Sequence, residues 1–594
     1  MSSRGPSGTC VRGEKMSGGQ GRSPIVGIDL GTTYSLVAVM RDGRPTVVPN
    51  ALGEVLTPSA VGLTENGEVL VGAAAKARAV LDPSSGAVAF KRDMGLERPR
   101  ILGGRSFTPQ ELSSLVLGSL KRDAEAALGV PIEEAVVTVP AYFGDLQRQA
   151  TRDAGAIAGL KVERIINEPT AAALAYGLHE RDREMRVAVL DLGGGTFDVT
   201  VLEIIEGVIE IQSSAGDARL GGEDFDTALA RYVAHAWREK QGLDLEEHAA
   251  AWSRLREACE GVKRRLSAAE RTRLVLPDLP LETGRRLTLD LELSRDDAER
   301  AWAPVLERVR GPIRQALKDA SLQAKDVDEV LLVGGSTRMP CVAAMSAELF
   351  GRLPLRKLPP DEAVALGAAV QGAMKGGDRA VEDLIVTDVA PFTLGVATAA
   401  QAGRQHITGI FSPILERGTV IPTSRVERYS TSRDFQREIR LEVYQGEHAR
   451  CEDNVKLGEY LFQGLPPAPA SEQAVDVRFT YDLNGILEVE MTVVSTGRKS
   501  AFVIEQRPGR LTPEQLEEAR QRMNALKLHP RDALPNTTAM ARADALFVQL
   551  TGPLRDELAA AIAAFRLALE AQEPVRIGEI RERLNAMVRH LKER

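Results

Sequence analysis

One local pattern occurs twice in this 594-residue chain and limits its fold more than any other feature. Residues 24–40 contain an apolar run, the triplet Asp-Leu-Gly at 29–31 and a second apolar run. Residues 186–204 repeat this order, with the same triplet at 191–193. Each copy predicts a buried strand that ends in a glycine turn and returns as a second strand. The repetition therefore predicts two related α/β lobes.

The two glycine turns predict phosphate binding. A turn of glycine and threonine presents successive backbone N–H groups, and glycine permits the close approach of an anion. Asp29 and Asp191 stand at the strand ends beside the turns, and Asp198 follows the second turn. Carboxylates beside phosphates suit a hydrated Mg²⁺. The sequence has no Gly-Lys pair and no GxGxxG motif after a strand, so it predicts neither a P-loop nor a dinucleotide site.

A third glycine-rich stretch supplies a candidate base pocket. Residues 328–338 predict a strand that enters a glycine turn at Gly334, Gly335 and Ser336. Glycines leave a flat surface for a purine ring, and the guanidinium of Arg338 can stack on it. This stretch completes a set of groups for binding a purine nucleotide.

Composition changes along the chain and predicts separate units. Residues 245–325 have helical periodicity, and the segment between Val396 and Phe411 is an Ala/Gly/Gln-rich loop by composition. Asn484-Gly485 predicts a hairpin turn, and Thr512 predicts a helix N-cap. The predicted units are a disordered tail at 1–22, an α/β unit at 23–380, a linker at 381–388, an alternating β unit at 389–508 and a helical unit at 509–594.

Composition also excludes several classes of protein. Lys and Arg number 75 against 83 Asp and Glu, which gives a net charge of −8 and no basic excess for a nucleic-acid partner. The four cysteines are far apart and form no CxxC pair, as expected for reduced thiols in a cytoplasmic protein. No apolar run is long enough to cross a membrane.

Several stretches resemble the DnaK-type (70-kDa heat-shock) molecular chaperones. They lie at residues 29–35, 167–173, 191–198 and 333–340. Within that family the chain is most similar to the HscC-type branch, on residues 90–95, 109–117, 409–417 and 526–532. The resemblance implies an actin-like two-lobed ATPase domain of α/β class, a linker, an all-β sandwich that binds peptides and an all-α helical lid over the peptide pocket.

The resemblance also assigns the nucleotide site. It implies that Lys91, Glu168, Asp191 and Thr196 are catalytic. It implies ATP or ADP as the ligand, with Mg²⁺ held mostly through water by Asp29, Asp191 and Asp198, and K⁺ as a further candidate ion. The implied ATP-binding residues are Gly31, Thr32, Thr33, Tyr34, Gly193, Gly194, Gly195, Thr196, Gly222, Glu260, Lys263, Arg264, Ser267, Gly334, Gly335, Ser336, Arg338 and Asp361.

Peptide binding and coupling residues follow from the same resemblance. Val396, Tyr429, Ser432 and Ile439 are implied to line the peptide pocket, and Tyr429 stands where the family has Phe. The implied coupling residues are Pro140, Arg148, Asp383, Leu384, Ile385, Val386 and Asp388. Thr387 stands where the family has a large apolar residue, which predicts weaker docking of the linker.

The resemblance implies an ATP-dependent chaperone that binds and releases extended hydrophobic segments of unfolded proteins. A J-domain cochaperone is the expected partner, and no nucleic acid or membrane is expected. Dependence on a nucleotide exchange factor is expected to be weak, because the segments between Lys91 and Phe107 and between Leu276 and Leu291 are shorter than in typical members. The alternatives are an actin-like ATPase without peptide binding and a regulator of another chaperone.

Overall fold

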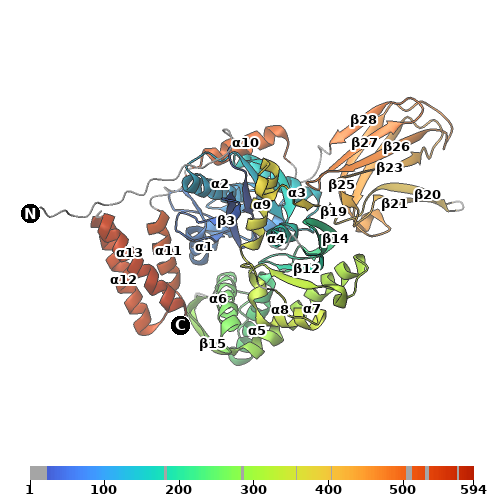
Figure 1. Ribbon diagram of the computed structural model, residues 1–594. Helices are drawn as coiled ribbons and strands as arrows, with labels where there is room; N and C mark the ends of the chain where they lie inside the picture. Colours follow the sequence, from blue (N-terminus) through green and yellow to red (C-terminus); the bar gives the residue numbers. More distant parts are fainter. Residues whose placement is uncertain are drawn as a thin grey trace, which may run out of the picture.

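The duplicated sequence pattern forms two sheets, one in each lobe (Figure 1), and their central strands pair in the same way. The computed structural model describes residues 23–178, 183–281, 286–355, 357–402, 405–503, 511–526, 528, 534–571 and 574–593. The predicted tail at 1–22 lies outside them. In the first sheet β1 (Val26–Asp29) pairs antiparallel with β2 (Tyr34–Arg41) and parallel with β10 (Glu134–Val139). In the second, β12 (Met185–Leu192) pairs antiparallel with β13 (Phe197–Ile205) and parallel with β17 (Glu329–Val333). The predicted duplication is confirmed.

The first lobe, described residues 23–167, is built on the sheet that contains β1. Strands β3 (Arg44–Val48), β4 (Thr57–Pro58) and β11 (Lys161–Asn167) complete that sheet. Its smaller elements are β5 (Ala60–Leu63), β6 (Val69–Val71), β7 (Gly86–Val88), β8 (Arg100–Leu102), β9 (Arg105–Phe107), η1 (Pro83–Ser85) and η2 (Phe90–Asp93). Its helices are α1 (Ala73–Leu81), α2 (Pro109–Leu128) and α3 (Asp145–Ile157).

The second lobe, described residues 183–355, is built on the sheet that contains β12. Strands β14 (Val208–Asp217) and β18 (Ile385–Val386) extend this sheet. Its other elements are α5 (Gly222–Gln241), α6 (Ala249–Ala268), β15 (Arg271–Pro280), β16 (Arg286–Ser294), α7 (Arg295–Asp319), η3 (Ala324–Asp326), η4 (Gly335–Arg338) and α8 (Pro340–Phe350).

The expectation that residues 245–325 are dominated by helices was wrong in part. The hairpin of β15 and β16 lies between α6 and α7. Leu274 and Leu276 on β15 and Leu289 on β16 are buried in the core of the second lobe, while their neighbours Arg273 and Asp290 are exposed and paired. This period-two alternation is the signal of a half-buried hairpin, and the charged helices on either side obscured it.

Two helices pack against each other where the lobes meet. They are α4 (Glu168–Gly177), which follows β11, and α9 (Ala363–Gly376), which lies against β1 and β2. A Cβ atom on Gly367 would overlap the backbone of Ala171, so this glycine allows the two helices to touch. The Ala-rich composition of α9 therefore reflects close packing at the junction. The turn η5 (Arg379–Val381) ends this part of the chain.

The β unit is a sandwich whose apolar core lies between two sheets. One sheet has the order β21 (Gln405–Leu415), β20 (Leu394–Ala402), β24 (Glu438–Gln445) and β25 (Val455–Gln463). The other has the order β23 (Thr423–Ser430), β26 (Ala474–Tyr481), β27 (Leu487–Val493) and β28 (Lys499–Val503). Strands β19 (Asp388–Val389) and β22 (Val420–Ile421) pair beside them, and η6 (Cys451–Asp453) precedes β25.

The segment after Val396 is mostly strand, which corrects the expectation of a loop. Its described residues belong to the long hairpin of β20 and β21, and residues 403 and 404 lie outside the described part. Cross-strand pairing between Ala397 and Phe411 extends to Ala402 and Gln405. Pairing with the neighbouring strand holds these small side chains in a strand although their strand propensity is low. Composition alone therefore gave the wrong prediction of a loop.

The helical end lies against the two lobes. Helix α10 (Pro513–Asn524) begins at the capping box of Thr512 and packs on α2 and α3. Helices α11 (Leu534–Phe547), α12 (Gly552–Ala571) and α13 (Pro574–Glu593) share a core and form what we call the terminal bundle. Figure 1 shows this bundle on the far side of the lobes from the sandwich. The expectation of a lid over the peptide pocket therefore does not describe this arrangement.

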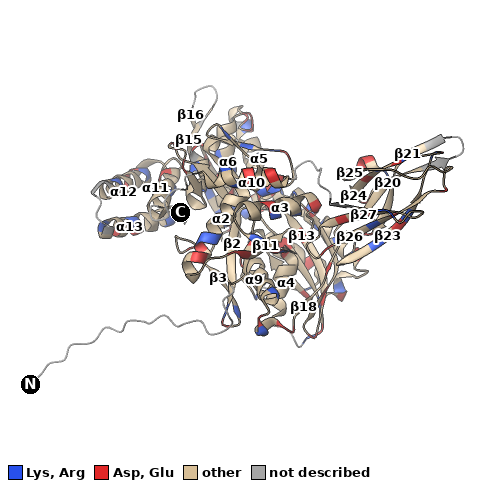
Figure 2. Cartoon of the chain, turned by 90° about the horizontal axis from the view of Figure 1, so that it is seen from above, with Lys and Arg blue, Asp and Glu red and all other residues tan. Residues whose placement is uncertain are grey.

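Charged residues of both signs are spread over the chain (Figure 2). Figure 2 shows basic and acidic residues interspersed over the lobes and the sandwich. Among the described residues, no helix is both long and apolar enough to cross a membrane.

Candidate functional site

The two glycine turns meet at the junction of the lobes. A Cβ atom on Gly194 would overlap the Thr33 hydroxyl, and one on Gly195 would collide with Thr32. The N–H of Gly193 donates to the carbonyl of Thr196 (3.1 Å), which closes the second turn. The backbone of the second turn therefore approaches the threonine side chains of the first turn at a distance that only glycine permits.

Four acidic side chains and one lysine gather behind these turns. Lys91 from η2 is 3% exposed, and its Nζ lies 2.5 Å from Glu168 Oε1 at the start of α4. Asp29 Oδ1 accepts from the Thr138 hydroxyl (3.1 Å), and Asp198 Oδ1 accepts from the N–H of Tyr142 (3.1 Å). The strand ends that carry these groups come from both sheets.

Their electrostatics favour an added positive charge. Burial and the Glu168 carboxylate raise the pKa of Asp29 to about 7 and the pKa of Asp198 to about 8. Burial, Glu168 and the neighbouring aspartates also raise the pKa of Asp191 well above its usual range. Several carboxylates in one buried place destabilise one another's charged forms unless a cation compensates them.

The donor set fits a hydrated divalent ion. Buried oxygens Asp191 Oδ2 and Asp198 Oδ2 have no hydrogen-bond partner among the described residues. Within this part of the chain, no three His, Cys, Asp or Glu side chains group closely enough to chelate a metal by themselves. The aspartates would therefore act through water and phosphate oxygens, as Mg²⁺ commonly requires.

Helix α6 supplies polar groups beside the turns. Lys263 Nζ donates to the Gly222 carbonyl (3.0 Å) and to Asp226 Oδ2 (2.9 Å). Glu260 accepts from Lys76 of α1 (2.9 Å), which joins the second lobe to the first. Arg264 donates to the Tyr34 hydroxyl (2.9 Å). The predicted residues Glu260, Lys263, Arg264 and Tyr34 are thus in one place, while the Ser267 hydroxyl donates to the Lys263 carbonyl.

The third glycine stretch closes the same site. Gly334 has φ +84°, and a Cβ atom there would overlap the Leu192 carbonyl. The Ser336 hydroxyl donates to the Gly193 carbonyl (2.8 Å). Arg338 donates to Asp361 Oδ2 through Nε and Nη2 (2.9 and 2.5 Å) and stays largely exposed. The ion pair fixes the guanidinium plane at the site's edge.

Sequence reasoning missed several residues that join the lobes. Arg92 Nε donates to the Gly195 carbonyl (3.1 Å), and its Nη2 donates to Asp224 Oδ2 (2.8 Å). Lys76 and Asp226, which hold Glu260 and Lys263, were also missed. Arg92 could have been found from the sequence, because it directly follows the predicted catalytic Lys91. Lys76 lies in an ordinary Ala-rich helix, and no sequence pattern marks it as part of the site.

A second network leads from the lobes to the sandwich. The buried Arg148 donates to the Phe143 carbonyl (3.0 Å), the Ala141 carbonyl (3.2 Å) and Asn167 Oδ1 (2.6 Å). It also reaches the Asn484 carbonyl on the turn between β26 and β27 (3.4 Å). Arg148 is 3% exposed, because the turn of the sandwich lies against it. Pro140 directly follows β10, and its carbonyl accepts from the N–H of Phe143.

The linker joins this network. Asp388 Oδ2 accepts from Asn167 Nδ2 (2.8 Å) and from the Thr170 hydroxyl (3.2 Å). Burial raises the pKa of Asp388, and nearby Arg148 and Arg164 oppose the rise. Its position beside Asn167 ties the linker to the residue that Arg148 also contacts.

The linker segment itself is docked on the second lobe. Ile385 and Val386 pair parallel with β14, Leu384 is buried and Asp383 is exposed. The N–H of Thr387 donates to the Ile209 carbonyl (3.0 Å), but its buried hydroxyl oxygen has no partner among the described residues. An unpaired buried hydroxyl is costly, and the effect of Thr387 on linker docking stays a prediction.

Comparison with known proteins identifies the family. The family model described as Hsp70 protein matches residues 25–102 and 98–586. The "Chaperone protein DnaK" of Thermotoga neapolitana is 44% identical over 484 residues, which make up 81% of this chain and 80% of that protein. The chain belongs to the Hsp70 family.

As an Hsp70 protein, the chain is an ATP-dependent molecular chaperone and hydrolyses ATP. Members of this family bind ATP and ADP with Mg²⁺, and they act on client polypeptides together with cochaperones. The prediction of a DnaK-type chaperone is confirmed, and nothing favours the alternatives without client binding. The assignment to the HscC-type branch stays a prediction.

The residues expected at the Hsp70 peptide pocket lie on both sheets of the sandwich. Val396 is 1% exposed and belongs to the sandwich core, against which Tyr429 and Ile439 pack half-buried. The Tyr429 and Ser412 hydroxyls are hydrogen-bonded (3.0 Å), so the extra oxygen on Tyr429 has a partner. Ser432 is exposed, and its N–H donates to Gln436 Oε1 (3.2 Å).

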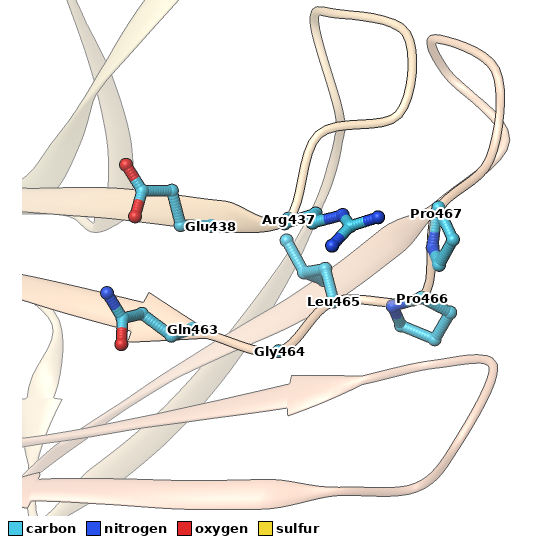
Figure 3. Close-up of a pocket in the computed structure, with 7 residues that line it drawn as sticks. All are labelled: Arg437, Glu438, Gln463, Gly464, Leu465, Pro466 and Pro467. Atoms are coloured by element: carbon cyan, nitrogen blue, oxygen red, sulfur yellow. The ribbon is translucent and has the colours of Figure 1, made fainter.

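A cavity of about 490 Å³ opens at the start of β24, and none of the four expected residues lines it. Figure 3 shows its lining, which comes from the start of β24, the end of β25 and the loop that follows. The N–H groups of Gly464 and Leu465 donate to the Arg437 carbonyl (3.0 and 3.1 Å), which fixes the rim next to Ile439. Sequence reasoning did not find this cavity, because the loop composition carries no signal for it.

Proposed function

We propose that residues 23–380 form an actin-like nucleotide-binding domain, residues 389–508 a peptide-binding sandwich and residues 509–594 a helical lid, which in this docked arrangement lies on the lobes and away from the sandwich (Figure 1). Residues 381–388 would be the linker between the first two. The observation that carries the proposal is the chain of contacts from Asn484 through Arg148 and Asn167 to Asp388. It joins the sandwich, the first lobe and the linker in one network.

In this proposal ATP lies between the two glycine turns. Backbone N–H groups of the turns at Thr32 and Gly194 bind the phosphates, and Gly222 and Ser336 support the second turn. Glu260, Lys263 and Arg264 on α6 bind the ribose side, with Ser267 one turn further along the helix. Arg338 and Asp361 flank the base, where the fixed guanidinium plane favours stacking.

Hydrolysis is proposed to depend on positioning and on charge. Glu168 holds the Lys91 ammonium, which orients the attacking water and stabilises charge on the transferred phosphoryl group. Asp198 and Thr196 orient water on the other side. Mg²⁺, held mostly through water by Asp29, Asp191 and Asp198, would neutralise phosphate charge, and K⁺ is a further candidate ion. These aspartates lie at strand ends, where the sheets prevent them from moving.

We propose that the docked arrangement is the ATP-bound one and releases peptide quickly. Its interface includes the bond from the Leu487 N–H to Asp145 Oδ1 (2.9 Å) and the ion pair of Arg417 with Asp319 (3.1 Å). Undocking after hydrolysis would free the sandwich to close on an extended hydrophobic segment, with Val396, Tyr429, Ser432 and Ile439 at the pocket. ATP and peptide then favour different states, so each lowers the affinity of the chain for the other.

The proposed partners follow from this cycle. A J-domain cochaperone would stimulate hydrolysis at the surface where Ile385 and Val386 dock on β14. Dependence on a nucleotide exchange factor would be weak, and strong acceleration of ADP release by such a factor would contradict this. The cytoplasm is the proposed location.

Peptide release in the two nucleotide states tests the proposal. A fluorescent peptide rich in Leu and Val should dissociate slowly with ADP and quickly with ATP. Lys91→Ala should abolish hydrolysis, whereas Lys325→Ala, an exposed lysine on the second lobe, should change nothing. Equal release rates in ADP and ATP would overturn the coupling, and unchanged hydrolysis in Lys91→Ala would overturn the assignment of the active site.

A further inference from the structure

The terminal bundle contacts both lobes. Arg542 of α11 forms a two-pronged ion pair with Glu54 of the first lobe (2.9 and 3.0 Å). Arg555 of α12 forms an ion pair with Asp278 of the second lobe (3.1 Å). Figures 1 and 2 both place the bundle beside the hairpin of β15 and β16. The bundle therefore spans the junction between the lobes.

The contact with the first lobe is also apolar. Helix α11 packs along α1, and Leu534 lies against a small cluster that includes Leu70, Ala74 and Ala75. Small side chains on α1 let the two helices approach closely. The contact with the first lobe is therefore ordinary helix packing, and it is more extensive than the contact with the second lobe.

The contact with the second lobe is polar. Arg254 of α6 donates to the carbonyls of Pro277 and Val548 (both 2.9 Å), so one guanidinium links β15 to the end of α11. The Arg555 guanidinium also lies 4.6 Å from the centre of the Phe547 ring. Polar contacts of this kind form and break more easily than a packed helix face.

The bundle is rigid enough to link its two contacts. Its own core contains the fully buried Phe565 and Leu558, together with Leu584 and Val588. A separation of the lobes cannot be absorbed by bending within such a core. One of the two lobe contacts has to break instead.

The spanned junction is the nucleotide side of the lobes. Helix α1, which carries the bundle, also carries Lys76, and α6 carries Glu260, its partner in the ion pair across the lobes. Tyr34 and Arg264 lie beside this pair, with the guanidinium 5.6 Å from the centre of the Tyr34 ring. A nucleotide between the lobes can leave only when these elements move apart.

We infer that the terminal bundle is an intramolecular clamp that retains bound nucleotide while it is docked on both lobes. The inference rests on the nucleotide site proposed above. The first-lobe contact anchors the bundle, and the contacts at Asp278 and Arg254 act as its releasable end. By reciprocity, nucleotide that holds the lobes together strengthens docking of the bundle.

The test measures dissociation of a fluorescent, non-hydrolysable ATP analogue from the full chain. Arg542→Glu and Arg555→Glu each replace an attractive pair by a repulsive one, and each should speed dissociation by about twofold to fivefold, the range set by a partly exposed ion pair. Arg566→Glu is the matched control, because its partner Asp544 lies within the bundle and not on a lobe.

A charge swap separates the clamp from simple damage to the bundle. Combining Glu54→Arg with Arg542→Glu should return dissociation towards the rate of the unaltered chain. Unchanged dissociation in the Arg542→Glu/Arg555→Glu double variant would overturn the clamp, and so would a swap that restores nothing. Failure of the unaltered chain to bind the analogue would instead overturn the nucleotide site, and the clamp with it.

Discussion

Asn484 makes a contact that exists only when the sandwich is docked. Its Oδ1 accepts from the backbone N–H of Ile165 on β11 (3.0 Å), a residue that is 1% exposed. β11 is the outer strand of the first sheet, so this N–H would face water if the sandwich moved away. We predict that Asn484→Ala destabilises the docked state selectively.

The magnitude follows from the chemistry of the lost bond. In the undocked state the Ile165 N–H is bonded to water, so the variant has no cost there. In the docked state the variant leaves this buried N–H without an acceptor. Such a group costs about 1–3 kcal/mol, which shifts the docking equilibrium by about 5-fold to 150-fold. Asn484→Asp keeps an oxygen at the same place and should largely preserve docking.

Two measurements check this prediction. Amide hydrogen exchange at Ile165 with ATP bound should accelerate in Asn484→Ala and stay slow in Asn484→Asp. The stimulation of peptide release by ATP should fall in the Ala variant alone. Unchanged protection of Ile165 together with full stimulation would show that this bond does not hold the domains together.

Three further predictions concern the nucleotide and peptide sites. Gly194→Ala should weaken ATP binding by at least about fivefold in a titration, because the added Cβ atom overlaps Thr33. The control Gly376→Ala should leave ATP binding unchanged, because the added Cβ atom meets open space. Tyr429→Phe should lower the unfolding free energy by about 0.5–1.5 kcal/mol through loss of the bond to Ser412, and should tighten Leu-rich peptides. Burial by itself would raise the pKa of Glu260, but Lys76 and Arg264 lower it from 4.5 to about 2. The charged Glu260 therefore contributes its full stabilisation above pH 4.5, and this contribution is lost as the pH falls towards 2. The stability difference from Glu260→Gln should therefore shrink over that interval in acid titrations.

The sequence predicted those parts of the fold that local patterns encode. The two strand-turn-strand copies, the turn at Asn484-Gly485 and the cap at Thr512 form as expected, because glycine turns and capping residues act over a few residues. The β15–β16 hairpin and the strands after Val396 were misjudged. Their alternation is short, and pairing with the other strand of the hairpin determines their conformation.

The candidate site divides in the same way. Residues in glycine turns and at strand ends, such as Gly194 and Asp191, are recognisable from sequence because their backbone conformation constrains their type. Lys76 and Asp226 act through side chains on ordinary helices, and no local pattern marks them. Their partners Glu260 and Lys263 are 184 and 37 residues away along the chain.

By itself the sequence determined the two glycine turns, the acidic strand ends beside them, and the separate α/β, β and helical units. The tertiary structure alone decided how those units meet. The sandwich covers Arg148, the linker pairs with β14, and the terminal bundle lies across both lobes. The physical reason is range: turns and caps are fixed by neighbouring residues, whereas docking depends on surfaces assembled from residues hundreds of positions apart.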